Sequence, residues 1–177
     1  GLYLDKLIAL DYLILLDQNA MANFYANASD LAKNPSYDRG NVYTMPWQSG
    51  VTGIGYNPKV TGGRKIETLD QLFTDKALKG KVTLLTEMRD TMGFLLKIVG
   101  ADPENFDEND WGNAIDELKK AVAAGQFRRF TGNDYVDDLN AGNIVACEAW
   151  SGDVIAMQFD NPDIKWVVPE EGLMIWA

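Results

Sequence analysis

The segment EAWSGD places one tryptophan and two acids within six positions, directly after an apolar run. Its Trp150 and Asp153 follow one predicted strand, and Glu87 and Asp90 follow another. An indole face attracts a cation by about 0.5–2 kcal/mol, and carboxylates accept charge-assisted hydrogen bonds. If the two strand ends lie side by side, these four side chains suit an organic ammonium ion.

Structural roles compete with this interpretation. A carboxylate near a helix start commonly accepts backbone N–H bonds, which by itself explains Asp90 and Asp153. Trp150 has the alternative of packing beneath a neighbouring loop, although a helix cap needs no indole. Both interpretations stay open for each residue.

Three further residues are candidates for the site. Trp47 and Ser49, in MPWQSG, combine an aromatic ring with a hydroxyl on an expected connecting strand, and Trp176 falls on the last apolar strand. Packing is the simpler explanation for each of them. Trp111 and Trp166 fit the core of a helix and of a strand, so we expect them to be structural.

Composition excludes several function classes. The 177 residues carry 26 acids and 16 bases, a formal charge of −10, which disfavours a nucleic-acid partner. There is no histidine and only Cys147, so the usual zinc spacings and the Ser-His or Cys-His catalytic arrangements are absent. We therefore expect no catalytic residues, no metal and no cofactor. No apolar run approaches the roughly 18 residues that cross a bilayer.

Hydrophobic periodicity predicts strands that alternate with helices. This pattern predicts an α/β domain of three layers with a largely parallel sheet, in which the junctions after residues 82–86 and 143–149 share one edge. The expected helices are residues 2–10, one turn at 28–33, 68–80, 87–99, 107–125, 133–142 and 151–160. The expected strands are residues 42–46, 52–57, 81–86, 126–131, 143–149 and two within 164–177.

Four segments taken in order carry a family resemblance. YTMPWQSGVTGIGYN, LLTEMRDTMGFLL, LNAGNIVACEAWSGDV and WVVPEEGLMIW resemble the periplasmic spermidine/putrescine-binding proteins that serve bacterial ABC importers. The resemblance covers residues 5–177 and implies one α/β lobe of a two-lobed, type II-like periplasmic binding protein. Within one domain of residues 1–177, it implies that 41–177 form the second lobe with hinge-crossing strands. Residues 1–40 would then be a remnant of the first lobe's last helix and a connecting segment.

The resemblance also implies ligand contacts. Trp150 and Asp153 match the family's ring-and-acid pair for the polyamine, and Asp90 and, more weakly, Glu87 match acids in its strand-to-helix loop. Trp176 matches an aromatic residue that stacks on the aliphatic part of the ligand in some members.

The implied partners are a polyamine and, in the full-length protein, the membrane subunits of an ABC importer. The parent protein is expected to be periplasmic, or extracellular and lipid-anchored, and this chain shows no signal peptide. Both ends look cut, and Leu15 and Ala22 stand where relatives often have proline. If one lobe keeps half of a micromolar binding energy, about −4 kcal/mol, its affinity is near millimolar. We expect self-association through the apolar stretch LIALDYLILL, exposed by truncation.

Two rival functions remain open. Related binding proteins accept other small solutes on one scaffold, so the chain could belong to a receptor for a different ligand. An enzyme that uses Glu87 and Asp90 as a carboxylate pair, as glycosidases do, has no other supporting residue in the sequence.

Overall fold

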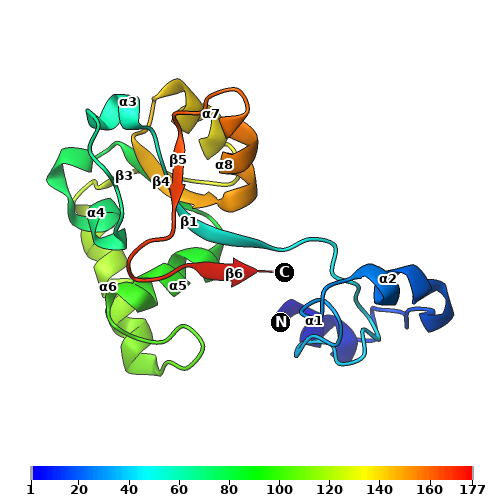
Figure 1. Cartoon of the computed structure of the whole chain (residues 1–177). Coiled ribbons are helices and arrows are strands. Elements are labelled where there is room, and N and C mark those ends of the chain that lie inside the picture. Colours follow the sequence, from blue (N-terminus) through cyan, green and yellow to red (C-terminus); the bar gives the residue numbers. More distant parts are fainter. Residues whose placement is uncertain (1, 177) are drawn as a thin grey trace. The chain divides into compact units, whose positions relative to one another are not determined.

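The computed structural model describes residues 2–176, and nothing is described of the side chains of Leu2 and Trp176. These residues divide into two compact units, 2–49 and Gly50–Trp176 (Figure 1). The boundary between these units lies after Ser49, whereas the sequence analysis began the second lobe at residue 41; the single domain of residues 1–177 remains a prediction. The assignment of residues 1–40 to another lobe remains a prediction.

The first unit is mostly loop with three short helical elements. The helix α1 spans Leu2–Ala9, as the apolar spacing predicted. A 3-10 helix, η1 at Gln18–Met21, is capped by the Asp17 carboxylate and continues into α2 at Ala22–Asn27. The sequence analysis did not expect η1 or α2. The single turn expected at 28–33 is present, because the Ser29 carbonyl accepts the N–H groups of Ala32 and Lys33 at 3.0 and 3.2 Å.

Buried Asp38 organises the end of this unit. Its carboxylate accepts hydrogen bonds from the backbone N–H groups of Val42, Tyr43 and Thr44 at 3.1, 2.9 and 2.6 Å, and from the Thr44 hydroxyl at 2.7 Å. Burial raises the pKa of Asp38, but these bonds outweigh burial and hold its pKa below the usual value. The strand expected at 42–46 is absent because the carboxylate takes the N–H groups that a neighbouring strand would need.

The second unit is built on one mixed sheet. Its strands are β1 Gly50–Tyr56, β2 Val82–Leu85, β3 Phe127–Thr131, β4 Ala146–Trp150, β5 Lys165–Val167 and β6 Met174–Trp176. Within the described residues their order is β3-β2-β4-β1-β5, with β6 also on β1. β2 is parallel to β3 and β4, whereas β1 is antiparallel to β4, β5 and β6. All strands but β1 therefore run in one direction, which confirms the largely parallel sheet.

Helices cover both faces of this sheet. One apolar cluster joins the sheet to α4 Leu69–Thr74, α5 Met88–Ile98 and α6 Glu108–Ala123. A second cluster, on the opposite face, joins it to α7 Tyr135–Ala141 and α8 Ser151–Gln158 (Figure 1). Neighbouring residues of one strand belong to different clusters, because successive side chains point to opposite faces of the sheet. The expected three layers are confirmed.

Local sequence explains where these helices begin. Thr68 and Gln71 form a reciprocal capping box at the start of α4, and Asp107 and Asp110 form another at the start of α6. The single helix expected over 68–80 is instead broken at Asp75, which ends α4 and caps η2 at Lys76–Leu78. A short helix that the sequence analysis missed, α3 at Pro58–Thr61, follows β1.

Glycine is required where Trp166 crosses β1. A Cβ atom on Gly53 would lie 2.5 Å from the Val167 carbonyl oxygen and 2.8 Å from the Trp166 ring. The ring also donates from Nε1 to the Ala149 carbonyl at 3.1 Å. These contacts confirm that Trp166 is a packing residue. Across the described residues, none of the helices has both the length and the apolar character needed to cross a bilayer.

Candidate functional site

The two strand-to-helix junctions singled out in the sequence lie next to each other. β2 and β4 are neighbouring parallel strands, with Val82 paired to Ala146, so their carboxyl ends share one edge of the sheet. α5 begins after the first strand and α8 after the second (Figure 1). This edge brings together residues that are about 60 positions apart in the chain.

Asp90 is the point where the two junctions meet. Its Oδ2 accepts hydrogen bonds from the Trp150 indole Nε1 at 2.9 Å and from the Thr52 hydroxyl, on β1, at 3.0 Å. The residue is 5% exposed. Burial raises the pKa of Asp90 above its usual value; the two hydrogen bonds oppose this rise, and the charge of Glu87 adds to it.

Asp153 is held from the opposite face of the sheet. Its Oδ2 accepts hydrogen bonds from the Tyr135 hydroxyl at 2.8 Å and from the Asn133 amide at 3.0 Å. The same hydroxyl accepts the Trp150 backbone N–H at 3.0 Å. The Tyr135 and Trp150 rings meet edge to face, with their centroids 6.4 Å apart. Burial and the bond to Asp153 raise the pKa of Tyr135, so it remains a donor.

Of the acids Glu87, Asp90 and Asp153, it is Glu87 that caps its helix in the structure. Glu87 is the N-cap of α5 and accepts the Arg89 backbone N–H at 3.2 Å. Asp90 instead binds side chains of two other strands. Asp153 lies in the first turn of α8, which begins without a side-chain cap. Trp150 is partly buried, and its indole N–H binds Asp90.

A further acid, Glu148, lies behind Asp90. It belongs to β4, is 0% exposed, and accepts the Leu85 backbone N–H at 2.9 Å. Burial raises the pKa of Glu148 to about 8, with smaller contributions from the charges of Asp90 and Glu87, whereas its hydrogen bonds lower it. The sequence analysis counted this acid in EAWSGD but did not name it as a site residue, because it lies within an apolar strand.

The acids at this edge have no paired cation among the residues that the structure describes. Within the part of the chain that the structure describes, no Lys or Arg forms an ion pair with Glu87, Asp90, Glu148 or Asp153. Nor do the described residues contain a cluster of His, Cys, Asp and Glu able to hold a metal ion. A bound organic cation would compensate this negative potential and also find the partly buried Trp150 beside it.

The described structure does not place the remaining predicted side chains relative to this edge. Trp47 is 90% exposed and Ser49 is exposed, and both belong to the other compact unit. The Trp176 backbone pairs with Gly50 on β1, but its side chain lies outside the described residues. For these three, a ligand contact remains a prediction.

Three side chains that hold the acids were missed in the sequence. Thr52 is the polar residue in the strand GVTGIGY, a position that marks the face toward Asp90. Asn133 and Tyr135 lie in NDYVDD, where only helix caps were expected. An aromatic hydroxyl at the start of a helix in a parallel sheet was the available signal, because helix starts gather at the binding edge.

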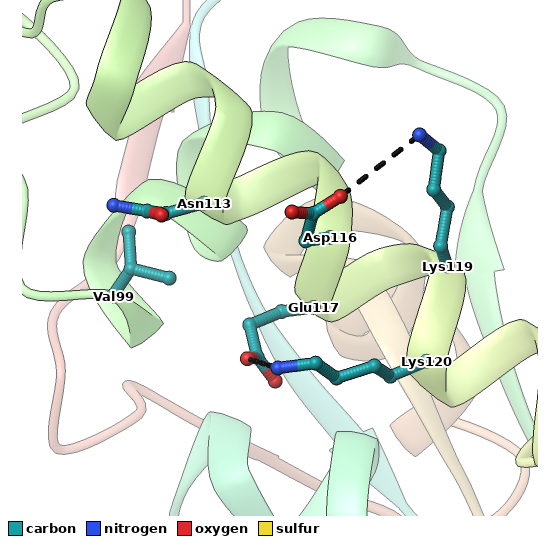
Figure 2. A pocket seen from close by; sticks show the side chains of 6 residues that line it. All are labelled: Val99, Asn113, Asp116, Glu117, Lys119 and Lys120. Atoms are coloured by element: carbon teal, nitrogen blue, oxygen red, sulfur yellow. Dashed lines mark hydrogen bonds and ion pairs between the residues drawn. The ribbon is translucent and has the colours of Figure 1, made fainter.

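A shallow depression on α6 lies apart from these residues (Figure 2). Two ion pairs cross it, Asp116–Lys119 at 3.9 Å and Glu117–Lys120 at 2.6 Å, each between residues three positions apart on one helix. Such exposed pairs are typical of a solvated helix surface and contribute little energy. None of the predicted site residues is among those that line it: Val99, Asn113, Asp116, Glu117, Lys119 and Lys120.

Comparison with known proteins places this geometry in a family. The profile of the family described as bacterial extracellular solute-binding protein matches residues 3–177. The chain belongs to this family. A protein of Listeria monocytogenes with a solved structure is 26% identical, with a TM-score of 0.86 over 98% of this chain and 52% of that one.

Two curated members of the solute-binding family are similar in sequence. The putrescine/cadaverine-binding protein of Pseudomonas aeruginosa is 26% identical over 97% of this chain and 51% of its own length. The spermidine/putrescine-binding periplasmic protein 1 of Haemophilus influenzae is 26% identical over 81% of this chain and 39% of its own length. The chain thus spans about half the length, or less, of the curated relatives that it matches.

Proposed function

We propose that this chain forms one lobe of a receptor that binds a polyamine, such as putrescine or spermidine, for an ABC importer. The observation that carries the proposal is the edge where β2 and β4 end. Four carboxyl groups there have no ion pair with Lys or Arg among the described residues, and the partly buried Trp150 lies beside them. The printed names of the relatives above point to the same ligand class.

Each residue has a distinct proposed role. The Trp150 ring lies against the alkyl chain and one ammonium group, and Asp153 accepts a hydrogen bond from that group. Asp90 supplies negative charge from below and holds the indole through Nε1. Glu87, exposed at the start of α5, widens the negative surface. Trp47, Ser49 and Trp176 remain candidate contacts.

We expect the isolated chain to bind weakly. It matches about half of the length of its relatives, and a receptor with two lobes divides its contacts between them. Half of a micromolar binding energy is about −4 kcal/mol, which corresponds to a Kd near 1 mM.

A titration of the tryptophan fluorescence tests the proposal. Putrescine and spermidine are expected to change the emission of Trp150 with a Kd on the order of millimolar, and salt at matched ionic strength is the blank. Trp150→Leu is the control, because it removes the indole that reports binding at this edge. A response to neutral sugars or amino acids, with none to diamines, would move the assignment to a receptor for another small solute.

The rival enzyme has no observation in its favour. Its two acids differ in setting, since Glu87 caps α5 and Asp90 binds Thr52 and Trp150. We therefore propose a receptor without catalytic activity. We also propose that the parent protein works outside the cytoplasm, as a periplasmic or lipid-anchored receptor, together with the membrane subunits of its importer; the name of a periplasmic relative supports this location.

We also propose that the chain self-associates through its first unit. Several apolar side chains of the stretch LIALDYLILL are solvent-exposed, among them Leu10 at 56%, Tyr12 at 71% and Ile14 at 86%. Exposed apolar surface of this kind favours contact between copies. Sedimentation velocity is expected to show a concentration-dependent dimer, and a double change of Tyr12 and Ile14 to Ser is expected to remove it. A monomer at every concentration contradicts this.

A further inference from the structure

Glu148 connects three elements through one oxygen atom. It lies on β4, two residues before Trp150, with its side chain fully buried. Its Oε2 accepts the backbone N–H of Leu85, at the end of β2, at 2.9 Å. The same oxygen lies 2.7 Å from the hydroxyl of Thr91, on α5 next to Asp90. The position of the first turn of α5 therefore depends on this carboxyl group.

The two short contacts of the Thr91 hydroxyl indicate that Glu148 is protonated. Its Oγ1 is 2.8 Å from the Leu85 carbonyl oxygen, as well as 2.7 Å from Glu148 Oε2. A carbonyl only accepts, and a hydroxyl carries one proton. Both short contacts are hydrogen bonds when Thr91 donates to Leu85 and accepts from a protonated Glu148. An ionised Glu148 would draw the Thr91 proton to itself and leave the Leu85 carbonyl without that donor.

The surroundings of Glu148 favour the protonated form. Asp90 and Glu87 face it from the start of α5, and Cys147 is its neighbour on β4. Within the described part of the chain, no cation pairs with it, and its second oxygen, Oε1, is buried without a hydrogen-bond partner. Placing a charge on this carboxyl would be costly, because burial and the nearby acids disfavour the anion more than the contacts with Leu85 and Thr91 favour it.

We propose that Glu148 is a positioning residue that holds the junction of β2 and α5, and with it Asp90, in its protonated form, and that a cation bound on the Trp150 ring above Asp90 causes it to release that proton. The ligand half of this proposal rests on the proposed function, whereas the positioning half does not. Glu148 itself contacts no ligand, since it is sealed from solvent.

Release of the proton to solvent water follows from charge. A bound ammonium group offsets the negative charge of Asp90 and Glu87, which makes ionised Glu148 less unfavourable. The Thr91 hydroxyl then turns from the Leu85 carbonyl to Glu148 Oε2, over contacts that are already 2.8 and 2.7 Å. Because coupling is reciprocal, ligand affinity rises as Glu148 loses its proton. Alkylammonium groups, with pKa values near ~10.4 as in lysine, stay charged throughout.

Carbon-13 NMR of the side-chain carboxyl groups of glutamate in the whole 177-residue chain tests the proposal. The Glu148 signal is identified as the one missing from Glu148→Gln, or by a through-bond assignment if that variant does not fold. Its midpoint is expected near pH 8. In Asp90→Asn the midpoint is expected to fall by about half a unit to one unit, which corresponds to a coupling of about threefold to tenfold.

Putrescine and a matched variant complete the experiment. Saturating putrescine is expected to lower the Glu148 midpoint in the same direction as Asp90→Asn does. Asp153→Asn, on the neighbouring junction, is expected to leave it unchanged, because Asp153 does not contact Glu148.

A Glu148 midpoint near the ordinary value of 4.5, or no shift in Asp90→Asn, overturns the positioning half. A shift in Asp90→Asn without one from putrescine upholds the positioning role of Glu148 but overturns proton release by the cation. In that case fluorescence decides separately: no diamine response there would mean that the proposed function itself has failed.

Discussion

The two junctions at the binding edge are alike in sequence but differ in structure. Each places an aspartate within the first turn of a helix that follows a parallel strand. Asp90 is 5% exposed and binds side chains of β1 and of the neighbouring junction. Asp153 is partly buried and binds two side chains: Asn133, just before α7, and Tyr135, the first residue of α7.

In the proposed function, this difference gives the two aspartates separate roles: Asp90 positions its neighbours, and Asp153 contacts the ligand. A buried carboxylate with two side-chain donors fixes its neighbours, and here it orients the indole of Trp150. A partly buried carboxylate, bound through one oxygen, keeps a face toward solvent. The buried Glu148 stands only behind the first junction, since it binds Leu85 and Thr91 there. The predictions below test this contrast, from the largest expected effect to the smallest.

The largest effect concerns pH and Glu148. The folded chain keeps the proton up to about pH 8, whereas an unfolded glutamate loses it near 4.5. Between these values the unfolded state binds fewer protons, so the free energy of unfolding falls as the pH rises. The full shift corresponds to an upper estimate on the order of 4–5 kcal/mol.

Thermal unfolding followed by circular dichroism from pH 5 to pH 9 measures this effect. Glu148→Gln is expected to lack most of the decline, whereas Glu87→Gln, which removes only a small contribution to the raised pKa of Glu148, is expected to keep most of it. Parallel curves for the unmodified chain and Glu148→Gln would contradict the buried acid.

The second prediction compares the two aspartates directly. Asp90→Ala leaves the Thr52 hydroxyl and the Trp150 N–H without their acceptor in a buried place, which is expected to cost about 2–3 kcal/mol. Asp153→Ala is expected to cost about 1 kcal/mol, because water can reach the groups that it releases. Urea unfolding of both variants measures the difference. Equal losses would remove the distinction between the two junctions.

The third prediction concerns Tyr135, which belongs to the second junction. Tyr135→Phe removes the donor to Asp153 and the acceptor of the Trp150 backbone N–H, at an expected cost of about 1–2 kcal/mol. Hydrogen exchange is expected to quicken at the Trp150 amide and to stay unchanged at the Leu85 amide, which Glu148 protects. Faster exchange at both amides would mean that the junctions do not act separately.

The smallest effect concerns the indole itself. Trp150→Phe keeps an aromatic face but removes the N–H that binds Asp90. The expected result is a threefold to tenfold rise in the putrescine Kd, about 0.7–1.4 kcal/mol, with a smaller change in stability. Trp150→Leu, which also removes the ring, is the matched control and is expected to weaken binding further. Equal affinities for the two variants would assign the whole effect to the hydrogen bond.

Much of the fold follows from the sequence because its signals are local. Apolar spacing and the Asp107 cap indicated α6, and the alternation of strands with helices indicated the two neighbouring junctions. The strand expected at 42–46 failed because Asp38, four to six residues earlier, binds its N–H groups. A side chain that competes with a sheet for backbone donors leaves no trace in hydrophobic periodicity.

The site was only partly predictable for a different reason. Trp150, Asp153 and Asp90 stand at strand ends, where chain order alone suggests a shared edge. Thr52 and Glu148 act through the register of β1, β2 and β4, which no local pattern specifies. An acid within the run IVACEA reads as an interruption of an apolar strand, and only its contact with Thr91 explains its place.

Two strands, β5 and β6, pair with the same side of β1, and their arrangement affects the order in which the site unfolds. β5 pairs with Ile54–Tyr56 and β6 with Gly50–Thr52, so the strand has two successive neighbours instead of a continuous one. Thr52, the donor to Asp90, belongs to the portion beside β6. A pulling force on the carboxyl end would therefore separate β6 from β1 first. This step would free the portion of β1 that carries Thr52, the donor to Asp90, while β5 remains paired with β1.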